Sequence, residues 1–380
     1  MDFELTEEQK MFQSMVRDFA LKEVAPGAAQ RDEDSTFPAE IVKKLGELGI
    51  MGVSYPEKYG GSGGDSVQQM ILLEELSRVE AGLGTVYIGT MSLCCYPIYK
   101  FASEELRHKY VTPLAQGKKT GCFALTEPSA GSDATAIQTT AVKEGKDYVL
   151  NGSKIFITNG NEADTIVVFV TLDRSLRHRG VIALVLDKKT PGFSVGKKEH
   201  KMGIRCSSTT ELIFENCRVP ASNLLSGEGK GFNVAIETID SSRAGVAAQA
   251  VGIAQGAFDA ALQFSKDRQQ FGQAISGFQA IQWMLADMAT RIEASRLLTY
   301  QAAQLKDAGK SFVKQAAMAK LFASEAAMWV TTKAVQVHGG YGYVKDYPVE
   351  RFFRDAKITE IYEGTSEMQR MTIARHLIKG

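Results

Sequence analysis

The segment GCFALTEPSAGSDA, residues 121–134, marks the point where the sequence changes character. Its first part, 121–126, begins a series of short runs rich in β-branched and aromatic residues. The other runs are 148–150, 155–158, 165–172, 181–187 and 211–214. Turn-forming residues separate them, as in Asn151-Gly152 and Asn159-Gly160. Short strands at this spacing predict a small antiparallel barrel or sandwich.

The sequence before this segment has helical patterns. Thr6 and Gln9 are placed as in a capping box, which predicts a helix start, and apolar residues such as Phe12 and Val16 follow near helical spacing. Further helices are predicted at 38–48, 67–79 and 104–114, with a glycine-rich turn at 59–65. This part of the chain is therefore expected to be helical.

Long helical patterns return after residue 229. Two apolar stripes have helical spacing, and a third, alanine-rich run covers 312–337 without a break. The stripes are Val246, Ala250, Ile253, Ala257 and Phe264, then Ile281, Leu285, Met288 and Ile292. We predict an α+β protein with an N-terminal helical domain at 1–117, a middle antiparallel β domain at 118–228 and a C-terminal four-helix bundle at 229–380.

Composition excludes several classes of function. A length of 380 residues favours two or three domains. The 44 basic and 44 acidic residues balance, which argues against a nucleic-acid surface and an electrostatic membrane anchor. The start, MDFELTEEQK, does not read as a signal peptide, and no spanning helix is expected. The five cysteines are best explained as reduced, buried thiols in a reducing compartment.

Common catalytic and phosphate-binding motifs are missing from the sequence. Neither GxGxxG nor GxxxxGK[ST] occurs, and GEGKG at 227–231 has the wrong spacing for both. No GxSxG elbow is present, and the five histidines have no metal-ligand spacing, so no metal site is expected. Motif tests alone indicate a three-part protein with glycine-rich ligand loops.

Three sets of segments resemble the acyl-CoA dehydrogenase family. They are CFALTEPSAGSDA (122–134), RQQFG (268–272), and QVHGGYGY (336–343) with RDAK (354–357) and IYEGTSEMQR (361–370). The resemblance covers nearly the whole chain in the family's order and spacing. It implies FAD-dependent α,β-dehydrogenation of an acyl-CoA, electron transfer to an electron-transfer flavoprotein, and a homotetramer built as a dimer of dimers.

The resemblance assigns the base to Glu363, which would remove the α-proton of the thioester. The backbone amide of Glu363 would donate to the thioester carbonyl, and Gly364 would let the backbone approach it. Without the motif, Glu363 would be interpreted as a helix-capping or surface carboxylate just before a helix. Some relatives place the base two residues after the aspartate of a DxxR segment; here that segment is Asp240–Arg243 and the position is Ser242, which cannot act as a carboxylate base.

The resemblance also implies ligand contacts. Residues beside the flavin ring would be Phe123, Ala124, Leu125 and Thr126, with Phe156, Ile157 and Thr158 on its other side. The remaining FAD contacts would be Ser132, Arg268, Phe271, Gln279, Gln336, Gly339, Gly340, Thr365 and Glu367, of which Arg268, Phe271 and Gln279 would reach the FAD of a neighbouring subunit. CoA contacts would be Ser132, Asp240, Arg243 and Gly364. Judged singly, the aromatic residues could be core and Arg268 a solvated helix end.

The acyl group is less well defined by the sequence. Ile88 occupies the position where relatives acting on dicarboxylic acyl groups carry arginine, which disfavours glutaryl-CoA. An apolar pocket is expected from Tyr87, Ile88, Met91, Cys94 and Cys95, suited to a short, branched or alicyclic chain such as butyryl. Two alternatives stay open: an oxygen-using acyl-CoA oxidase, and a flavin- or CoA-binding scaffold without turnover. The expected location is the bacterial cytoplasm or the mitochondrial matrix.

Overall fold

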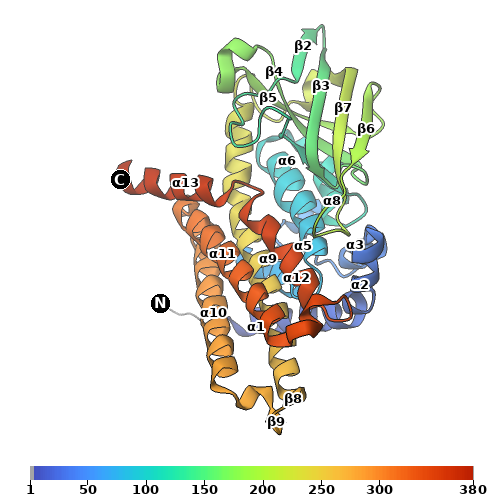
Figure 1. Ribbon diagram of the computed structural model, residues 1–380. Helices are drawn as coiled ribbons and strands as arrows, with labels where there is room; N and C mark the ends of the chain where they lie inside the picture. The colour runs from blue at the N-terminus through green and yellow to red at the C-terminus, as the bar shows by residue number, and fades with distance from the viewer. Residues whose placement is uncertain (1–3, 380) are drawn as a thin grey trace.

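The structure is a computed structural model that describes residues 4–379, and its parts follow the predicted order (Figure 1). Helices come first, a curled sheet follows, and long helices complete the chain. The predicted α+β class and helix–β–helix order are confirmed. The domain boundaries drawn from the sequence stay a prediction.

The N-terminal part is helical from the predicted capping box onward. The Thr6 hydroxyl accepts from the Gln9 amide, and the Gln9 side chain accepts from the Thr6 amide. The helices are α1 (Glu7–Phe19), η1 (Ala20–Val24), α2 (Ala25–Asp34), α3 (Ala39–Glu47), η2 (Glu57–Tyr59), α4 (Ser66–Ser77), α5 (Ala81–Tyr87), η3 (Ile88–Cys95), α6 (Tyr96–Phe101), α7 (Glu104–Leu106), η4 (Arg107–Val111) and α8 (Thr112–Ala115).

One nearly continuous helix, Ala81–Phe101, forms the centre of this part. It consists of α5, the π-helical turn η3 and α6. By length and composition alone this helix could cross a membrane, since an 18-residue stretch of it has a mean hydropathy of 1.2. However, 89% of that stretch is buried inside the protein. A buried core helix passes the same test, and burial accounts for the apolar composition here. All five cysteines are buried and unpaired, as expected.

The middle part is a curled sheet in which most neighbouring strands are antiparallel. Its strands are β1 (Gly121–Ala124), β2 (Thr140–Glu144), β3 (Asp147–Thr158), β4 (Thr165–Thr171), β5 (Val181–Asp187), β6 (Phe193–Lys198) and β7 (Thr209–Pro220), with short helical turns η5 (Arg174–Gly180) and η6 (Ala221–Asn223). The order is β1-β4-β2-β3-β7-β6, with β5 on β4. Two pairings differ from the antiparallel expectation, because β1 and β2 both run parallel to β4.

The prediction of separate strands at 148–150 and 155–158 is wrong. Asn151-Gly152 is not a turn: β3 continues through it, with a register shift against β7 between Leu150 and Gly152. Gly152 has a φ of 139°, and a Cβ there would lie 2.8 Å from the Thr139 Cα. Glycine is therefore needed for a bulge and a close approach inside one strand, a role that its sequence context does not separate from a turn.

The C-terminal part contains three long helices with shorter ones beside them. They are α9 (Gly231–Asp267), α10 (Gln279–Asp307) and α11 (Val313–His338), then η8 (Gly339–Tyr343), α12 (Val349–Ala356), η9 (Lys357–Glu360) and α13 (Ser366–Lys379). Between α9 and α10 lies the hairpin of β8 (Gln269–Gln270) and β9 (Gln273–Ala274), followed by η7 (Ile275–Gly277). α11 packs along α9 and α10, and α12 and α13 pack on α11.

Glycine residues let α9 approach α4 closely. A Cβ on Gly252 would lie 2.3 Å from the Glu74 carbonyl oxygen, and one on Gly256 would lie 2.2 Å from the Arg78 carbonyl oxygen. No side chain fits at these two positions. Glycine therefore fixes the distance between the N-terminal helices and the bundle.

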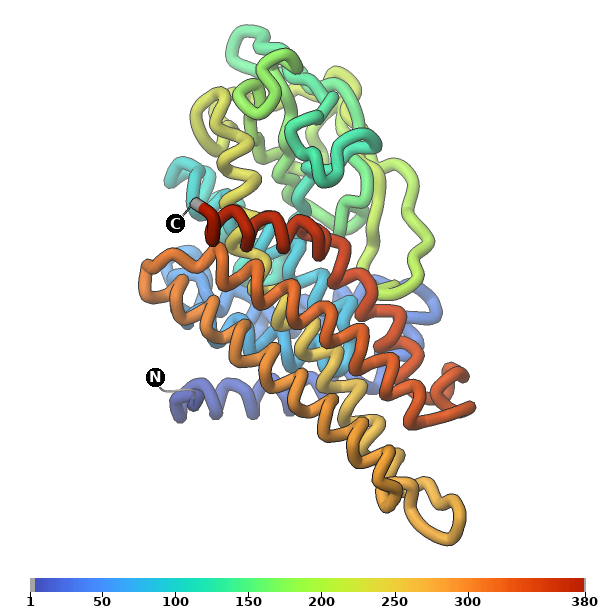
Figure 2. The backbone as a smooth tube through the Cα atoms, turned by 60° about the vertical axis from the view of Figure 1, so that its left-hand side comes forward, coloured from blue at the N-terminus to red at the C-terminus, as the bar shows by residue number. Residues whose placement is uncertain are grey.

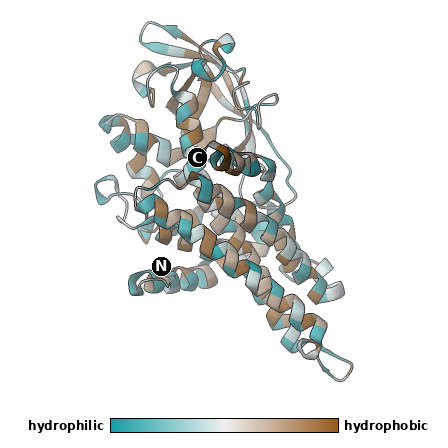
Figure 3. Ribbon diagram, turned by 90° about the vertical axis from the view of Figure 1, so that its left-hand side faces the viewer, coloured by the Kyte–Doolittle hydropathy of each residue, from teal (hydrophilic) through white to brown (hydrophobic). Residues whose placement is uncertain are grey.

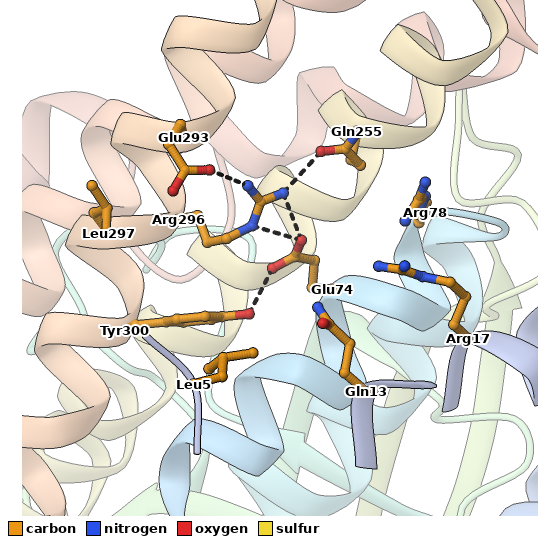
Figure 4. A pocket seen from close by; sticks show the side chains of 10 residues that line it. All are labelled: Leu5, Gln13, Arg17, Glu74, Arg78, Gln255, Glu293, Arg296, Leu297 and Tyr300. Atoms are coloured by element: carbon orange, nitrogen blue, oxygen red, sulfur yellow. Dashed lines mark hydrogen bonds and ion pairs between the residues drawn. The ribbon is translucent and has the colours of Figure 1, made fainter. Parts of the chain in front are cut away.

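A polar cleft of about 450 Å³ lies where α1, α4, α9 and α10 meet (Figure 4). At its centre the buried Glu74 carboxylate accepts from Arg296 at 2.9 Å and from the Tyr300 hydroxyl at 3.0 Å. Arg296 is also bonded to Gln255 and Glu293. Each of these charged groups has its partner, so we interpret the cleft as a junction that ties α4 to the bundle.

A second buried ion pair holds the segment at residues 121–134. Lys154 on β3 is 0% exposed, and its ammonium donates to the Glu127 carboxylate at 2.6 Å and to the Leu125 carbonyl at 3.1 Å. Glu127 in turn accepts from the backbone amides of Gln138 and Thr139. One cation therefore connects both ends of the loop between β1 and β2 to the sheet.

Replacing Lys154 by methionine should destabilise the protein strongly. Removing one partner of a buried ion pair typically costs about 3–5 kcal/mol because the other charge stays buried and uncompensated. Urea unfolding should show this loss for Lys154→Met. The matched control is Lys143→Met, whose ion pair with Glu228 at 2.8 Å is solvent-exposed and should contribute under about 1 kcal/mol. Equal midpoints for the two variants would contradict the prediction.

Candidate active site

Glu363 lies in a short loop between η9 and α13 with an unusual backbone. Its φ is 53°, and that of Gly364 is 94°. A left-handed conformation is uncommon for a residue with a side chain, and it persists only where surrounding contacts enforce it. A Cβ on Gly364 would lie 2.8 Å from the Gln369 Nε2, so only glycine fits the second position.

Two buried side chains hold the carbonyl groups of this loop. The Lys320 ammonium, from α11, donates to the Gly364 oxygen at 2.7 Å. The Gln369 amide, from α13, donates to the same oxygen at 2.7 Å and to the Glu363 oxygen at 3.3 Å. With its backbone held from two helices, the Glu363 side chain faces the first half of α9.

The environment of Glu363 makes its carboxylate a better base than an exposed one. The residue as a whole is half-buried, yet its Oε2 is shielded from solvent. Burial raises its pKa to about 7, although the nearby Ser242 hydroxyl, Lys320 and Arg243 each act to lower it. A carboxyl group with a pKa near neutrality is suited to accept a proton from a weak carbon acid.

Buried polar atoms without hydrogen-bond partners gather around this carboxylate. Of the 15 such atoms in the described part of the chain, six belong to residues here: Ser242 Oγ, Arg243 Nε and Nη1, Glu363 Oε2, Ser366 Oγ and Gln369 Oε1. Asp240 lies 2.8 Å from Arg243 Nη1 and so balances the arginine charge. Buried polar groups are normally satisfied, so a cluster of orphaned ones indicates a place built for a polar ligand.

The β-domain residues assigned to the flavin show two kinds of placement. Ala124, Leu125 and Ile157 have buried side chains, so only their backbone can face a ligand. Phe156 is 60% exposed and has a φ of 57°, which turns an aromatic ring out of β3. Phe123 is half-buried against Phe169, with ring centroids 4.7 Å apart. Thr126 and Thr158 are half-buried, and Ser132 is exposed in the loop after β1.

The other predicted FAD contacts lie at the opposite end of the bundle. Arg268 and Phe271 belong to the β8–β9 hairpin, which Figures 1 and 2 show far from the sheet. The 25 positions of helix from Arg243 to Arg268 correspond to about 37 Å at a rise of about 1.5 Å per residue. Phe271 is 93% exposed. One copy of the chain therefore does not bring this group to Glu363.

Further predicted residues lie at that same distal end. The Arg268 guanidinium lies 5.3 Å from the Tyr341 ring centroid, which places the start of η8 beside the hairpin. Gln279 and Gln336 are exposed, and a Cβ on Gly339 or Gly340 would meet nothing within 4 Å. Thr365 and Glu367, in contrast, lie beside Glu363 at the start of α13.

The expected acyl pocket is only partly assembled as predicted. A Cβ on Gly245, one turn after Ser242, would come within 4 Å of Leu73, Ile88 and Ser92. Ile88 therefore faces the same side of α9 as the base. Cys94 faces β1 instead, since its thiol lies 3.6 Å from the Thr165 carbonyl oxygen, and Cys95 is adjacent to Tyr55. Met91 and Tyr87 are buried, and the Tyr87 hydroxyl has no partner among residues 4–379.

The sequence interpretation missed three residues that support the site: Lys154, Lys320 and Gln369. A signal existed for Lys320, because it is the one cation in the run AAMAKLFASEAA, residues 316–327. Lys154 lies in the middle of β3, where the sequence had predicted a gap between two strands, so its burial was not expected. Within residues 4–379, no group of three or more His, Cys, Asp or Glu side chains could hold a metal ion.

Comparison with known proteins covers the whole chain. Models of the acyl-CoA dehydrogenase N-terminal, middle and C-terminal domains match residues 6–118, 122–217 and 229–378. The short-chain specific acyl-CoA dehydrogenase of Clostridium acetobutylicum is 53% identical over 379 residues, 100% of both chains.

Two solved structures agree. Butyryl-CoA dehydrogenase from Megasphaera elsdenii has a TM-score of 0.98 at 49% identity and full coverage of both chains. A chain in the structure of the electron transferring flavoprotein of Acidaminococcus fermentans has a TM-score of 0.99 at 54% identity, again with full coverage. With this likeness over its whole length, the chain belongs to the acyl-CoA dehydrogenase family, among enzymes that resemble the short-chain and butyryl-CoA dehydrogenases.

Proposed function

We propose that this enzyme uses FAD to convert a short-chain acyl-CoA into its 2-enoyl-CoA, with Glu363 as the base, and delivers the electrons to an electron-transfer flavoprotein. The observation that carries this proposal is the Glu363 carboxylate, which faces α9 and whose shielded Oε2 has no hydrogen-bond partner among residues 4–379. A structural carboxylate would be paired or solvated. This one is surrounded by unsatisfied polar groups that a thioester and its pantetheine chain could satisfy.

The chemistry required of the protein is removal of one weakly acidic proton. Glu363 takes the proton from the α-carbon, and the electron pair of that C–H bond becomes the new α,β double bond. Bound FAD would supply the acceptor for the hydride that leaves the β-carbon. The Glu363 backbone amide would donate to the thioester oxygen and stabilise charge on it. The Glu363 carboxylate lies near Ser242 and Arg243 of α9, and the backbone φ of Glu363 is left-handed.

The residues present fit a flavin. An aromatic ring that is 60% exposed on a strand, as at Phe156, costs apolar surface in water and is suited to stack on a planar ring. Phe123–Thr126 offer backbone groups at the end of β1, and Ser132 could meet the pyrophosphate. Thr365 and Glu367 would contact the adenosine end. Core packing alone does not explain the exposed ring of Phe156.

The side chains near the base favour a short apolar acyl chain. Leu73, Ile88 and Ser92 surround Gly245 one helical turn beyond Ser242, so an acyl chain leaving the reacting carbons meets side chains at once. Ile88 is 2% exposed and offers no charge to a distal carboxylate. Butyryl-CoA is the first substrate to test.

Assembly would complete the cofactor site. We propose that Arg268, Phe271, Gln279, Gln336, Gly339 and Gly340 contact the FAD of a neighbouring subunit in a homotetramer. Large apolar side chains are exposed along the outer bundle helices, where Figure 3 shows brown residues among the teal ones. They include Trp283, Leu297, Met318, Phe322, Met371 and Leu377. The likeness to the chain from Acidaminococcus supports the electron-transfer flavoprotein as the acceptor.

Glu363→Gln should retain FAD and bind butyryl-CoA but lose flavin bleaching. Loss of a general base typically lowers the rate by about 10²–10⁴-fold. Anaerobic stopped-flow absorbance would measure it, with Glu40→Gln, on the exposed face of α3, as the control. Near-native bleaching by Glu363→Gln would exclude this residue as the base. Peroxide formed at the turnover rate in air would instead indicate an oxidase.

The rate should follow the ionisation of Glu363. Only the ionised carboxylate accepts a proton, and burial raises its pKa to about 7. Therefore kcat/KM for butyryl-CoA should rise tenfold per pH unit below that value and level off above it. A profile flat between pH 5 and 8 would contradict a base with a raised pKa.

Arg268→Ala should weaken FAD retention even though Arg268 is remote from Glu363 in its own chain. The guanidinium would lose its charge-assisted bonds to the neighbour's pyrophosphate, each worth about 1.5–3 kcal/mol. The ratio of FAD to protein after gel filtration measures the loss, and Lys266→Ala, exposed at the end of α9, is the control. Tight FAD binding by a stable monomer would rule out a shared site.

A further inference from the structure

A buried lysine supports the base loop from behind. Lys320 is 0% exposed on α11. Its ammonium makes no ion pair within 4.0 Å among residues 4–379 and instead donates to the Gly364 carbonyl oxygen. Burying an unpaired ammonium costs several kcal/mol, so a hydrophobic residue would stabilise the helix better. The cost of keeping lysine here calls for a role at the loop that it contacts.

The contact acts on a part of the backbone with two left-handed residues in a row. Glu363 and Gly364 are consecutive residues with positive φ, at 53° and 94°. The Gly364 oxygen accepts from Lys320 and Gln369, both at 2.7 Å, and these donors come from different helices. Two donors on one carbonyl oxygen fix the orientation of that peptide group. That peptide links Gly364 to Thr365, and Gln369 also donates to the Glu363 carbonyl at 3.3 Å. The backbone directly after the Glu363 side chain is therefore held.

Charge is the second consequence of this contact. Lys320 is among the groups that lower the Glu363 pKa, and Glu363 is the carboxylate that most favours the charged form of Lys320. The other charged groups that face the pair are Arg243 on α9, Glu360 on η9 and Glu367 on α13. Arg243 already has Asp240 beside it at 2.8 Å. Lys320 is therefore the cation here without a carboxylate of its own.

We propose that Lys320 is a positioning residue for the base: it holds the Gly364 carbonyl, so that the Glu363 carboxylate faces the substrate, and keeps a positive charge behind it. Gln369 donates to the same carbonyl oxygen, and we call these two donors the clamp. This inference rests on the proposed role of Glu363 and adds to it the groups that orient the base and set its ionisation.

The test compares Lys320→Met with Lys320→Arg across a pH series, using butyryl-CoA and the purified FAD-loaded protein. Removing a positive charge disfavours the ionised carboxylate, so Lys320→Met should move the rising limb of kcat/KM to higher pH. A shift of about one pH unit corresponds to a tenfold loss on that limb. Lys320→Arg keeps the charge, so its kcat/KM should rise over the same pH range as in the wild type. Lys310→Met, in the exposed turn before α11, should match the wild type.

Gln369→Met separates the clamp from the charge. This variant removes one donor to the Gly364 oxygen without changing charge. We therefore expect kcat to fall by about tenfold or more, while kcat/KM rises over the same pH range as in the wild type. It also decides the clamp if Lys320→Met cannot be purified with FAD. Wild-type kcat in Gln369→Met, or a wild-type limb in Lys320→Met, would overturn the proposal. If the wild-type protein itself fails to bleach, the proposed function is wrong, which is a different result.

Discussion

The left-handed backbone at Glu363 and Gly364 is the constraint on which the arrangement of the active site depends. An extended or helical φ at Glu363 would turn its side chain away from α9 and leave the polar groups of Ser242 and Arg243 without their neighbour. Such a conformation costs about 1–3 kcal/mol and has to be enforced by contacts. Those contacts come from α11 and α13. The direction of the base therefore depends on how the bundle helices pack.

A buried lysine that donates to a loop carbonyl occurs twice in this fold. Lys154 donates to the Leu125 carbonyl from the sheet, and Lys320 donates to the Gly364 carbonyl from the bundle. Both are 0% exposed, and burial lowers the pKa of each to about 8. In each case the ammonium holds a carbonyl group of an irregular segment for which we propose ligand contacts. A long side chain with a charged end can reach a loop carbonyl from a rigid element, which a short polar residue cannot do.

The sequence predicted the order of the parts well because periodicity is a local property. Most predicted helices and strands lie at the expected places, and the capping box at Thr6 formed as its spacing indicated. The failures have non-local causes. Gly152 looked like a turn because nothing in its neighbourhood shows that Thr139 lies against it. The parallel pairing of β1 with β4 depends on the path of the intervening chain. Cys94 faces the sheet because of how two domains meet.

In the candidate site too, some features follow from local sequence and others only from contacts between distant segments. Glu363 could be proposed from its motif, whereas the raised pKa, the orphaned atoms around it and the role of Lys320 exist only once α9, α11 and α13 are packed. A larger division separates the proposed FAD contacts. Phe156 lies on β3 and Arg268 directly before β8, and Figure 1 shows these two strands at opposite ends of the molecule. Residues so far apart act on one cofactor only if two copies pair the hairpin of one with the sheet of the other. In that arrangement catalysis requires assembly, and the exposed Phe271 and Phe156 are the parts of each site that the other copy helps to cover.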